Sequence, residues 1–160
     1  MSLRFARRLA DAASVLDPVS DALQAAVKAL PKPARNVLDG VWFGVPLHPA
    51  LTDVPLGSWT AAAAFDAIDS MTSRDSMVDA ADAALAVGVL GALPAAATGL
   101  NDWSYLGGDS KRIGTLHAII NSTGLALNVA SLICRRNDRR DAGRILSLAA
   151  YSGALFSARD

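Results

Sequence analysis

The chain has 160 residues, a size that suits one domain, and its 15 basic and 15 acidic residues give a formal net charge of zero and no nucleic-acid footprint. Hydrophobic residues make up 52% of the chain but aromatic residues only 6%, so the apolar mass is mostly Ala, Leu and Val. The single cysteine, Cys134, excludes an internal disulfide and an iron–sulfur cluster held by this chain alone. Two classes stay open, an Ala-rich soluble bundle and a membrane bundle with small residues at its helix contacts.

The first residues resemble the start of a secretory signal but lack its apolar core. Arg4, Arg7 and Arg8 supply a basic beginning, whereas Asp11 and Asp17 interrupt the stretch that should follow. No cleavable signal is therefore predicted.

An amphipathic helix is predicted within residues 1–33. The helical spacing consists of Leu16, Val19 or Ser20, Leu23, Val27 and Leu30. Pro31 and Pro33 end the pattern, because proline cannot continue a helix. Such a helix can lie on a membrane surface or pack on its own domain, and the sequence leaves both open.

Four apolar blocks follow, at about residues 49–68, 78–100, 113–134 and 145–158. The third has about the 20 residues that a bilayer core requires. Four such blocks separated by polar turns predict an all-α fold, an up-down four-helix transmembrane bundle over residues 34–160.

Each block also carries small or polar residues in a stripe that follows one helix face. These stripes are Asp53, Gly57, Thr60, Ala64 in the first block; Ala84, Gly88, Gly91, Ala95, Thr98, Asp102 in the second; His117, Asn121, Gly124, Asn128, Ser131 in the third; and Gly143, Ser147, Ala150, Ala154 in the fourth. Membrane helices associate through such faces, because close backbone approach replaces the hydrophobic drive that lipid does not provide. We expect the stripes to face other helices.

The two histidines are predicted to meet. His48 begins the first block and His117 lies about one turn into the third, with Asp53 and Asn121 each about one turn deeper. In an up-down bundle the first and third helices run parallel, and Asp102 comes from the loop on the same side. We expect these five residues to form a polar cluster at one membrane interface.

That cluster suits several chemistries. His48 and His117 could ligate a metal or the iron of haem b, with Asp53 or Asp102 fixing a histidine tautomer. The same groups could bind a quinone or relay protons. They could also form a buried network that fixes helix register without chemistry.

Other charged residues are predicted to have structural roles. Asp79 and Asp82 are predicted to complement the dipole at the start of the second helix. Four arginines, Arg135, Arg136, Arg139 and Arg140, are predicted to be a charged flank that holds a loop in water. No serine, histidine and acid trio has convincing spacing, so no catalytic residue is assigned and enzymatic activity of the chain alone is not expected.

Several of these residues recur in one known group of proteins. They are His48-Pro49, Asp53, Pro55, Trp59, Asp66, Thr98-Gly99-Leu100, Asp102-Trp103, His117-Ala118 and Asn121. With them the chain resembles the predicted membrane proteins of domain of unknown function family 2231, particularly actinobacterial members, over roughly residues 38–151. The resemblance implies a four-span membrane protein, sometimes fused or genetically linked to a Rieske-type domain, with no established activity.

The expected function is that of an accessory or anchoring subunit of a membrane redox assembly, multi-pass in the inner (plasma) membrane. Its partners would be the lipid bilayer, other membrane subunits or further copies of the chain, and a Rieske-type or other redox protein. The alternatives are a haem- or quinone-binding electron carrier, a small transporter and a purely structural membrane protein. The count of all basic residues, which includes Arg4, Arg7, Arg8 and Arg159, favours a cytoplasmic N-terminus, whereas counting only the tight juxtamembrane runs favours the loop after Cys134 as the cytoplasmic side. We expect a cytoplasmic N-terminus.

Overall fold

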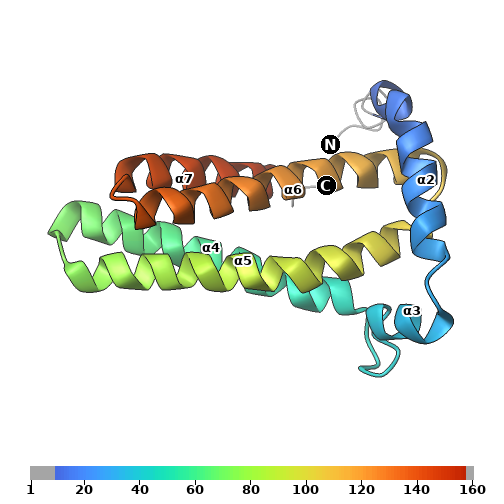
Figure 1. The fold of residues 1–160 in the computed structure, drawn as a ribbon, viewed down its shortest axis with the longest axis horizontal. Coiled ribbons are helices and arrows are strands. Elements are labelled where there is room, and N and C mark those ends of the chain that lie inside the picture. The colour runs from blue at the N-terminus through green and yellow to red at the C-terminus, as the bar shows by residue number, and fades with distance from the viewer. Residues whose placement is uncertain (1–9, 158–160) are drawn as a thin grey trace. The chain divides into compact units, whose positions relative to one another are not determined.

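The chain is all-α. The computed structural model describes residues 10–157, with side chains described to residue 153, and these residues contain no strand. A helical segment at residues 10–13 and a 3-10 turn, η1 (Ser14–Leu16), precede the longer elements (Figure 1). These are α2 (Asp17–Lys28), α3 (Lys32–Leu38), α4 (Leu47–Thr72), α5 (Asp75–Trp103), α6 (Gly108–Arg136) and α7 (Arg140–Ser157).

The four apolar blocks lie in α4 to α7, and the helices extend beyond the predicted ranges. Polar residues supply the extensions: α5 begins at Asp75, an acidic residue in its first turn, and α6 ends on Arg135 and Arg136. Both placements complement the helix dipole. Ser73 and Asp138 take positive φ values, 50° and 58°, in the turns after α4 and after α6. By length and composition, α5 and α6 could each cross a membrane.

The described chain divides into two compact units. Unit 1 contains residues 10–50 and 95–119, and unit 2 contains residues 51–94 and 120–157. The helices α4, α5 and α6 therefore each contribute to both units. The division predicted at residue 33 stays a prediction.

Unit 2 has an apolar core to which four helices contribute. Trp59 and Ala62 come from α4, and Leu85 and Ala92 come from α5. Leu125 and Leu132 of α6 and Tyr151 of α7 pack against them. Gly88 allows this packing, because a Cβ there would collide with the indole of Trp59.

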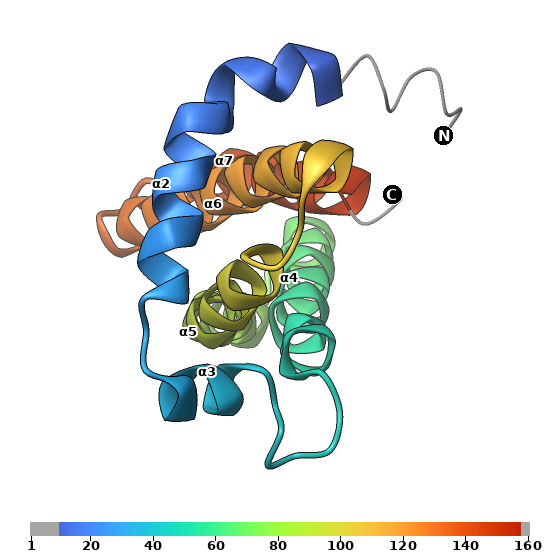
Figure 2. The ribbon, with the colours of Figure 1, turned by 90° about the vertical axis from the view of Figure 1, so that its right-hand side faces the viewer.

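In unit 1, α2 lies beside the end of α5 and the beginning of α6 (Figure 2). Polar side chains make this contact. Gln24 donates from Nε2 to the carbonyl oxygens of Trp103 and Leu106, both at 3.0 Å. The hydroxyls of Ser20 and Thr115 lie 3.1 Å apart. The helix therefore packs on its own domain.

The predicted apolar positions of α2 mostly face away from that contact. Val19, Leu23 and Leu30 are exposed, whereas Val27 is buried. Packing on the domain thus leaves most of the apolar face uncovered. Arg4, Arg7 and Arg8, which precede this helix, lie outside the described residues, as does Arg159.

Most members of three predicted stripes face other helices, although His117 of the third is exposed. The first stripe faces outward, apart from a hydrogen bond from the Thr60 hydroxyl to Tyr151 of α7. Gly88, Ala95 and Thr98 of the second stripe are buried, and so are the members of the third and fourth at Gly124, Asn128, Ser131, Gly143 and Ala150. The prediction was wrong for the first stripe, since Asp53, Gly57, Thr60 and Ala64 are all exposed. The buried face of α4 instead carries Pro55, Trp59, Ala62 and Asp66, because the large indole takes the interior position.

Candidate functional site

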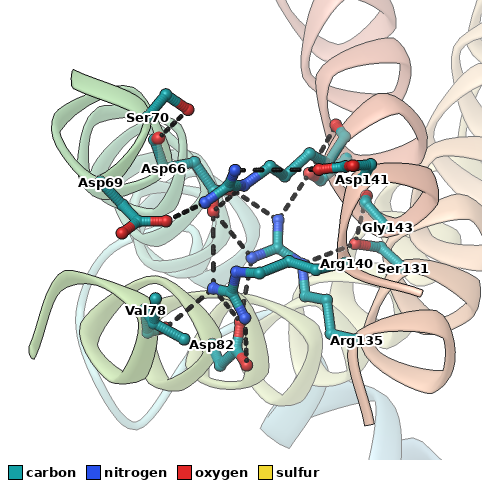
Figure 3. Close-up of polar contacts among 12 residues, drawn as sticks. Asp66, Asp69, Ser70, Val78, Asp82, Ser131, Arg135, Arg140, Asp141 and Gly143 are labelled. Carbon is teal, nitrogen blue, oxygen red and sulfur yellow. Dashed lines mark hydrogen bonds and ion pairs between the residues drawn. The ribbon is translucent and has the colours of Figure 1, made fainter. Parts of the chain in front are cut away.

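The most extensive polar site of unit 2 is centred on the guanidinium of Arg135 (Figure 3). Its side chain is completely buried, and it forms a two-point ion pair with Asp66, with Nη1–Oδ1 and Nη2–Oδ2 distances of 3.0 and 2.5 Å. Nη1 also donates to Asp82 Oδ1 at 2.9 Å, Nη2 to Ser147 Oγ at 3.1 Å, and Nε to Ser131 Oγ at 3.1 Å. All five N–H donors of the guanidinium therefore have acceptors.

Two further arginines complete this cluster. Arg140 donates from Nη1 and Nη2 to the two carboxylate oxygens of Asp82, at 3.1 and 3.0 Å. Arg144 pairs with Asp69, and its Nε lies 3.3 Å from Asp66 Oδ1. Three carboxylates thus face three guanidinium groups, and the buried charge is compensated. We call Asp66, Asp69, Asp82, Arg135, Arg140 and Arg144 the ion cluster.

The close approach of α6 and α7 shapes this site. A Cβ at Gly143 would lie 2.7 Å from Cγ of Arg135, so glycine leaves room for the arginine. Ser131 Oγ donates to the carbonyl oxygen of Gly143 at 2.6 Å, and this bond fixes the hydroxyl that accepts from Arg135. Small residues at the helix contact therefore make space for the largest polar side chain in it.

Two sequence interpretations are wrong here. Arg135 does not flank an aqueous loop, because it is buried and bonded to residues of α4, α5 and α7 as well as its own helix. Arg140 does not either, because it is mostly buried and paired with Asp82. Asp82 is not a dipole partner at the helix start, because it lies in the second turn of α5 and pairs with two arginines. The sequence did contain an indication that Arg135 is buried. Steps of three and four residues from Asn128 reach Ser131 and then Arg135, so Arg135 continues the predicted stripe.

In unit 1, His48 is held against α5. Its Nδ1 lies 2.8 Å from the carbonyl oxygen of Ala95, and because a carbonyl oxygen only accepts, Nδ1 is the donor of this hydrogen bond. The ring occupies the notch at Gly99, where a Cβ would lie 2.6 Å from Cε1 of the imidazole. His48 is thus oriented by backbone atoms and not by a carboxylate.

Asp102 and His117 belong to the same unit as His48. Each is close enough to His48 for an electrostatic interaction between the side chains. His117 is exposed and Asp102 is partly buried. The sequence predicts that these three residues lie close together, and their placement in one unit allows it.

The other two predicted site residues, Asp53 and Asn121, lie in unit 2. Asp53 is exposed and Asn121 is partly buried. Among residues 10–157 no three His, Cys, Asp or Glu side chains are arranged as a metal site, although a haem iron requires only two axial ligands. The cofactor-binding assignment for the five residues stays a prediction.

A second polar group in unit 1 was not predicted. Asn101 is fully buried and donates from Nδ2 to Asp39 Oδ1 at 2.5 Å, and the hydroxyl of Tyr105 donates to Asp39 Oδ2 at 3.0 Å. Arg35 lies over the Tyr105 ring, with its Cζ 4.6 Å from the ring centroid. These residues join α3 to the end of α5.

A comparison with known protein families finds one family that matches the region of these helices. The family model described as "Predicted membrane protein (DUF2231)" matches residues 44–158. The chain belongs to this family. The resemblance expected from the histidine, aspartate and proline motifs is thereby confirmed, and membership carries no established activity. No curated protein and no solved structure matches the chain.

Proposed function

We propose that the chain is an integral membrane protein that spans the inner (plasma) membrane four times through α4 to α7 and serves as an accessory or anchoring subunit of a redox assembly. The supporting observation is the distribution of polar and apolar side chains. Of the five largest fully buried side chains among the described residues, only Leu85 is apolar, and the others are Asn101, Asn128, Ser104 and Ser131.

Large apolar side chains, by contrast, lie on the outside. On α5 and α6 they include Val87, Leu90, Leu93, Leu100, Ile119, Val129 and Ile133. Only 28% and 17% of the most apolar stretches of these two helices are buried, whereas the core helix of a soluble protein is mostly buried. Polar residues inside and apolar residues outside fit lipid as the surrounding medium.

By length and composition only α5 and α6 of the described helices qualify as membrane spans, but the charged residues of α4 and α7 that belong to the ion cluster are paired. Asp66, Asp69, Arg140 and Arg144 all have charged partners within unit 2. Charges near a helix end are tolerated in a bilayer when they are paired or reach the interface. The exposed apolar residues of α2 favour a position for that helix at the membrane surface.

A subunit role is supported by the exposed face of α4. Asp53, Gly57, Thr60 and Ala64 present small and polar side chains outward, the surface that packs closely against another membrane helix. The occupant would be another membrane subunit, including a Rieske-type or other redox partner, or a second copy of the chain.

Two measurements test the proposal. Carbonate washing of membranes should leave the protein in the pellet, and its release into the supernatant would refute the membrane role. Purification in mild detergent should recover a complex or an oligomer. A monodisperse monomer without partners would contradict the subunit role and leave the membrane role standing.

A second candidate is a haem- or quinone-binding electron carrier, favoured by the geometry of His48. Because Nδ1 faces the Ala95 carbonyl, Nε2 is the nitrogen available to an iron or to a donor group. The purified protein should then show a Soret band that is lost when either His48 or His117 is changed to alanine. A colourless protein that also binds no quinone would remove this candidate.

A further inference from the structure

A basic pocket opens between the end of α2, the helix α3 and the turn after α5. Lys28, Lys32 and Arg35 line it together with Asn36 and Tyr105, and its volume is about 350 Å³. All of these residues belong to unit 1. Three cationic side chains around one small cavity favour an anion as its ligand.

The one carboxylate in the pocket wall is already engaged. Asp39 accepts from Asn101 Nδ2 and from the Tyr105 hydroxyl, so both of its oxygens have donors. The pocket residues carry three positive charges and one negative charge, which leaves a net charge of +2. An anion entering the pocket therefore meets an attractive field.

Arg35 has donors available for such an anion. Its Nε and Nη2 atoms are buried and have no hydrogen-bond partner among the described residues. Stacking on Tyr105 holds the plane of the guanidinium. Because Nε and Nη2 form the edge that binds two oxygens of one phosphate, a tetrahedral oxyanion would satisfy both.

The loop that follows α3 relates this pocket to a membrane. Val41, Trp42, Phe43 and Val45 are at least half exposed, and the two aromatic rings lie 5.4 Å apart. Gly40 and Gly44, with φ values of 75° and 81°, form the turn that presents them. Tryptophan in particular is enriched where lipid headgroups meet the acyl chains.

We propose that this pocket binds a phosphate group, and that the aromatic loop presents the pocket to the headgroup layer so that an anionic phospholipid supplies the phosphate. The phosphate site rests on the pocket alone. The lipid source rests on the membrane location proposed above.

The test uses the full chain purified in detergent, with adduct formation followed by native mass spectrometry. Phosphatidylglycerol, phosphatidylcholine and inorganic phosphate are titrated separately. The informative variant is Lys28→Gln with Lys32→Gln, because both side chains are exposed. The matched control is Arg136→Gln with Arg139→Gln, which removes two exposed charges outside the pocket.

Phosphatidylglycerol should bind more tightly than phosphatidylcholine. The lysine variant should weaken its binding about fivefold for each charge removed, or about twenty-five-fold in all, whereas the control should not. Equal binding by the lysine variant and the control would overturn the phosphate site.

Binding of inorganic phosphate that depends on the two lysines, without selective binding of phosphatidylglycerol, would retain the site and overturn the lipid source. Carbonate washing tests the membrane location separately, so its failure is distinguishable from failure of the site.

Discussion

Asp66 and Arg135, which are 69 residues apart in the sequence, join α4 to α6 through a buried two-point ion pair. Such a pair is costly to break from one side, because the remaining charge loses its main partner in a medium of low dielectric constant. Its replacement by two apolar residues removes both charges together. For a structural ion pair, removing both charges should therefore cost less stability than removing one, and a catalytic or transport site carries no such expectation.

Arg135→Met should destabilise the protein by about 3–5 kcal/mol, because Asp66 loses its two-point partner. Asp66→Leu combined with Arg135→Met should recover most of that loss, since Arg140 and Arg144 continue to compensate Asp82 and Asp69. Denaturation in mixed detergent micelles measures both.

The control for this pair is Asp141→Asn. Asp141 is 98% exposed and lies 4.0 Å from Arg144, so its loss should change the stability by less than about 1 kcal/mol. A double variant no more stable than Arg135→Met would contradict a purely structural role for the pair.

Gly99→Ala should displace His48. The new Cβ would lie 2.8 Å from Nδ1, so the ring must leave the notch and lose its bond to the Ala95 carbonyl. The expected cost is about 1–3 kcal/mol, measured as a lower melting temperature.

Gly57→Ala is the matched change on α4, because nothing lies within 4 Å of its Cβ position. It should stabilise the helix by up to about 1 kcal/mol. Equal effects of the two substitutions would show that His48 does not occupy the notch.

Asn128→Leu should stabilise unit 2. The Asn128 side chain is fully buried, and neither its Nδ2 nor its Oδ1 has a hydrogen-bond partner among the described residues. Removing an unsatisfied buried amide should gain about 1–3 kcal/mol. A loss of stability in the same denaturation assay would instead show that the amide binds a partner that the chain does not supply.

Docking of α2 should weaken in acid. The hydrogen bond from Arg112 holds the pKa of Asp17 below its ordinary value of 3.8. A lowered folded-state pKa stabilises the docked form fully above the ordinary value, and the contribution is lost as the pH falls through the lowered one.

A nitroxide attached at position 23, in a Cys134→Ser background, should therefore become more mobile below about pH 3.8. Asp17→Asn should show raised mobility at neutral pH already. Identical pH profiles for the two proteins would assign the docking to other contacts of α2.

The helices were predictable from the sequence because each apolar block is long and is bounded by polar turns. The buried face of α4 was not, because the small-residue pattern through Gly57 competes with a second pattern that contains Trp59. Burial of the larger side chain decided between them. Within α5 and α6 no such competitor exists, and the stripes face inward for most of their length, with His117 exposed.

The site was only partly predictable. His48, Asp102 and His117 belong to one compact unit, as parallel first and third helices would require, whereas Asp53 and Asn121 belong to the other. Arg135 was missed because an arginine beside Arg136 at a helix end resembles a membrane flank. Only its position on the stripe of Asn128 and Ser131 distinguishes it, and a partner as distant in sequence as Asp66 leaves no local pattern.

In the ion cluster, the negative and positive charges lie on different helical hairpins, α4–α5 and α6–α7. Its three carboxylates all lie on α4 and α5, and its three guanidinium groups all lie on α6 and α7. Two copies of the same hairpin would bring like charges together, whereas the two different hairpins neutralise each other. The sign of the charge thus distinguishes the two hairpins from each other, so half-chains expressed separately should reassemble with each other and reject their own kind.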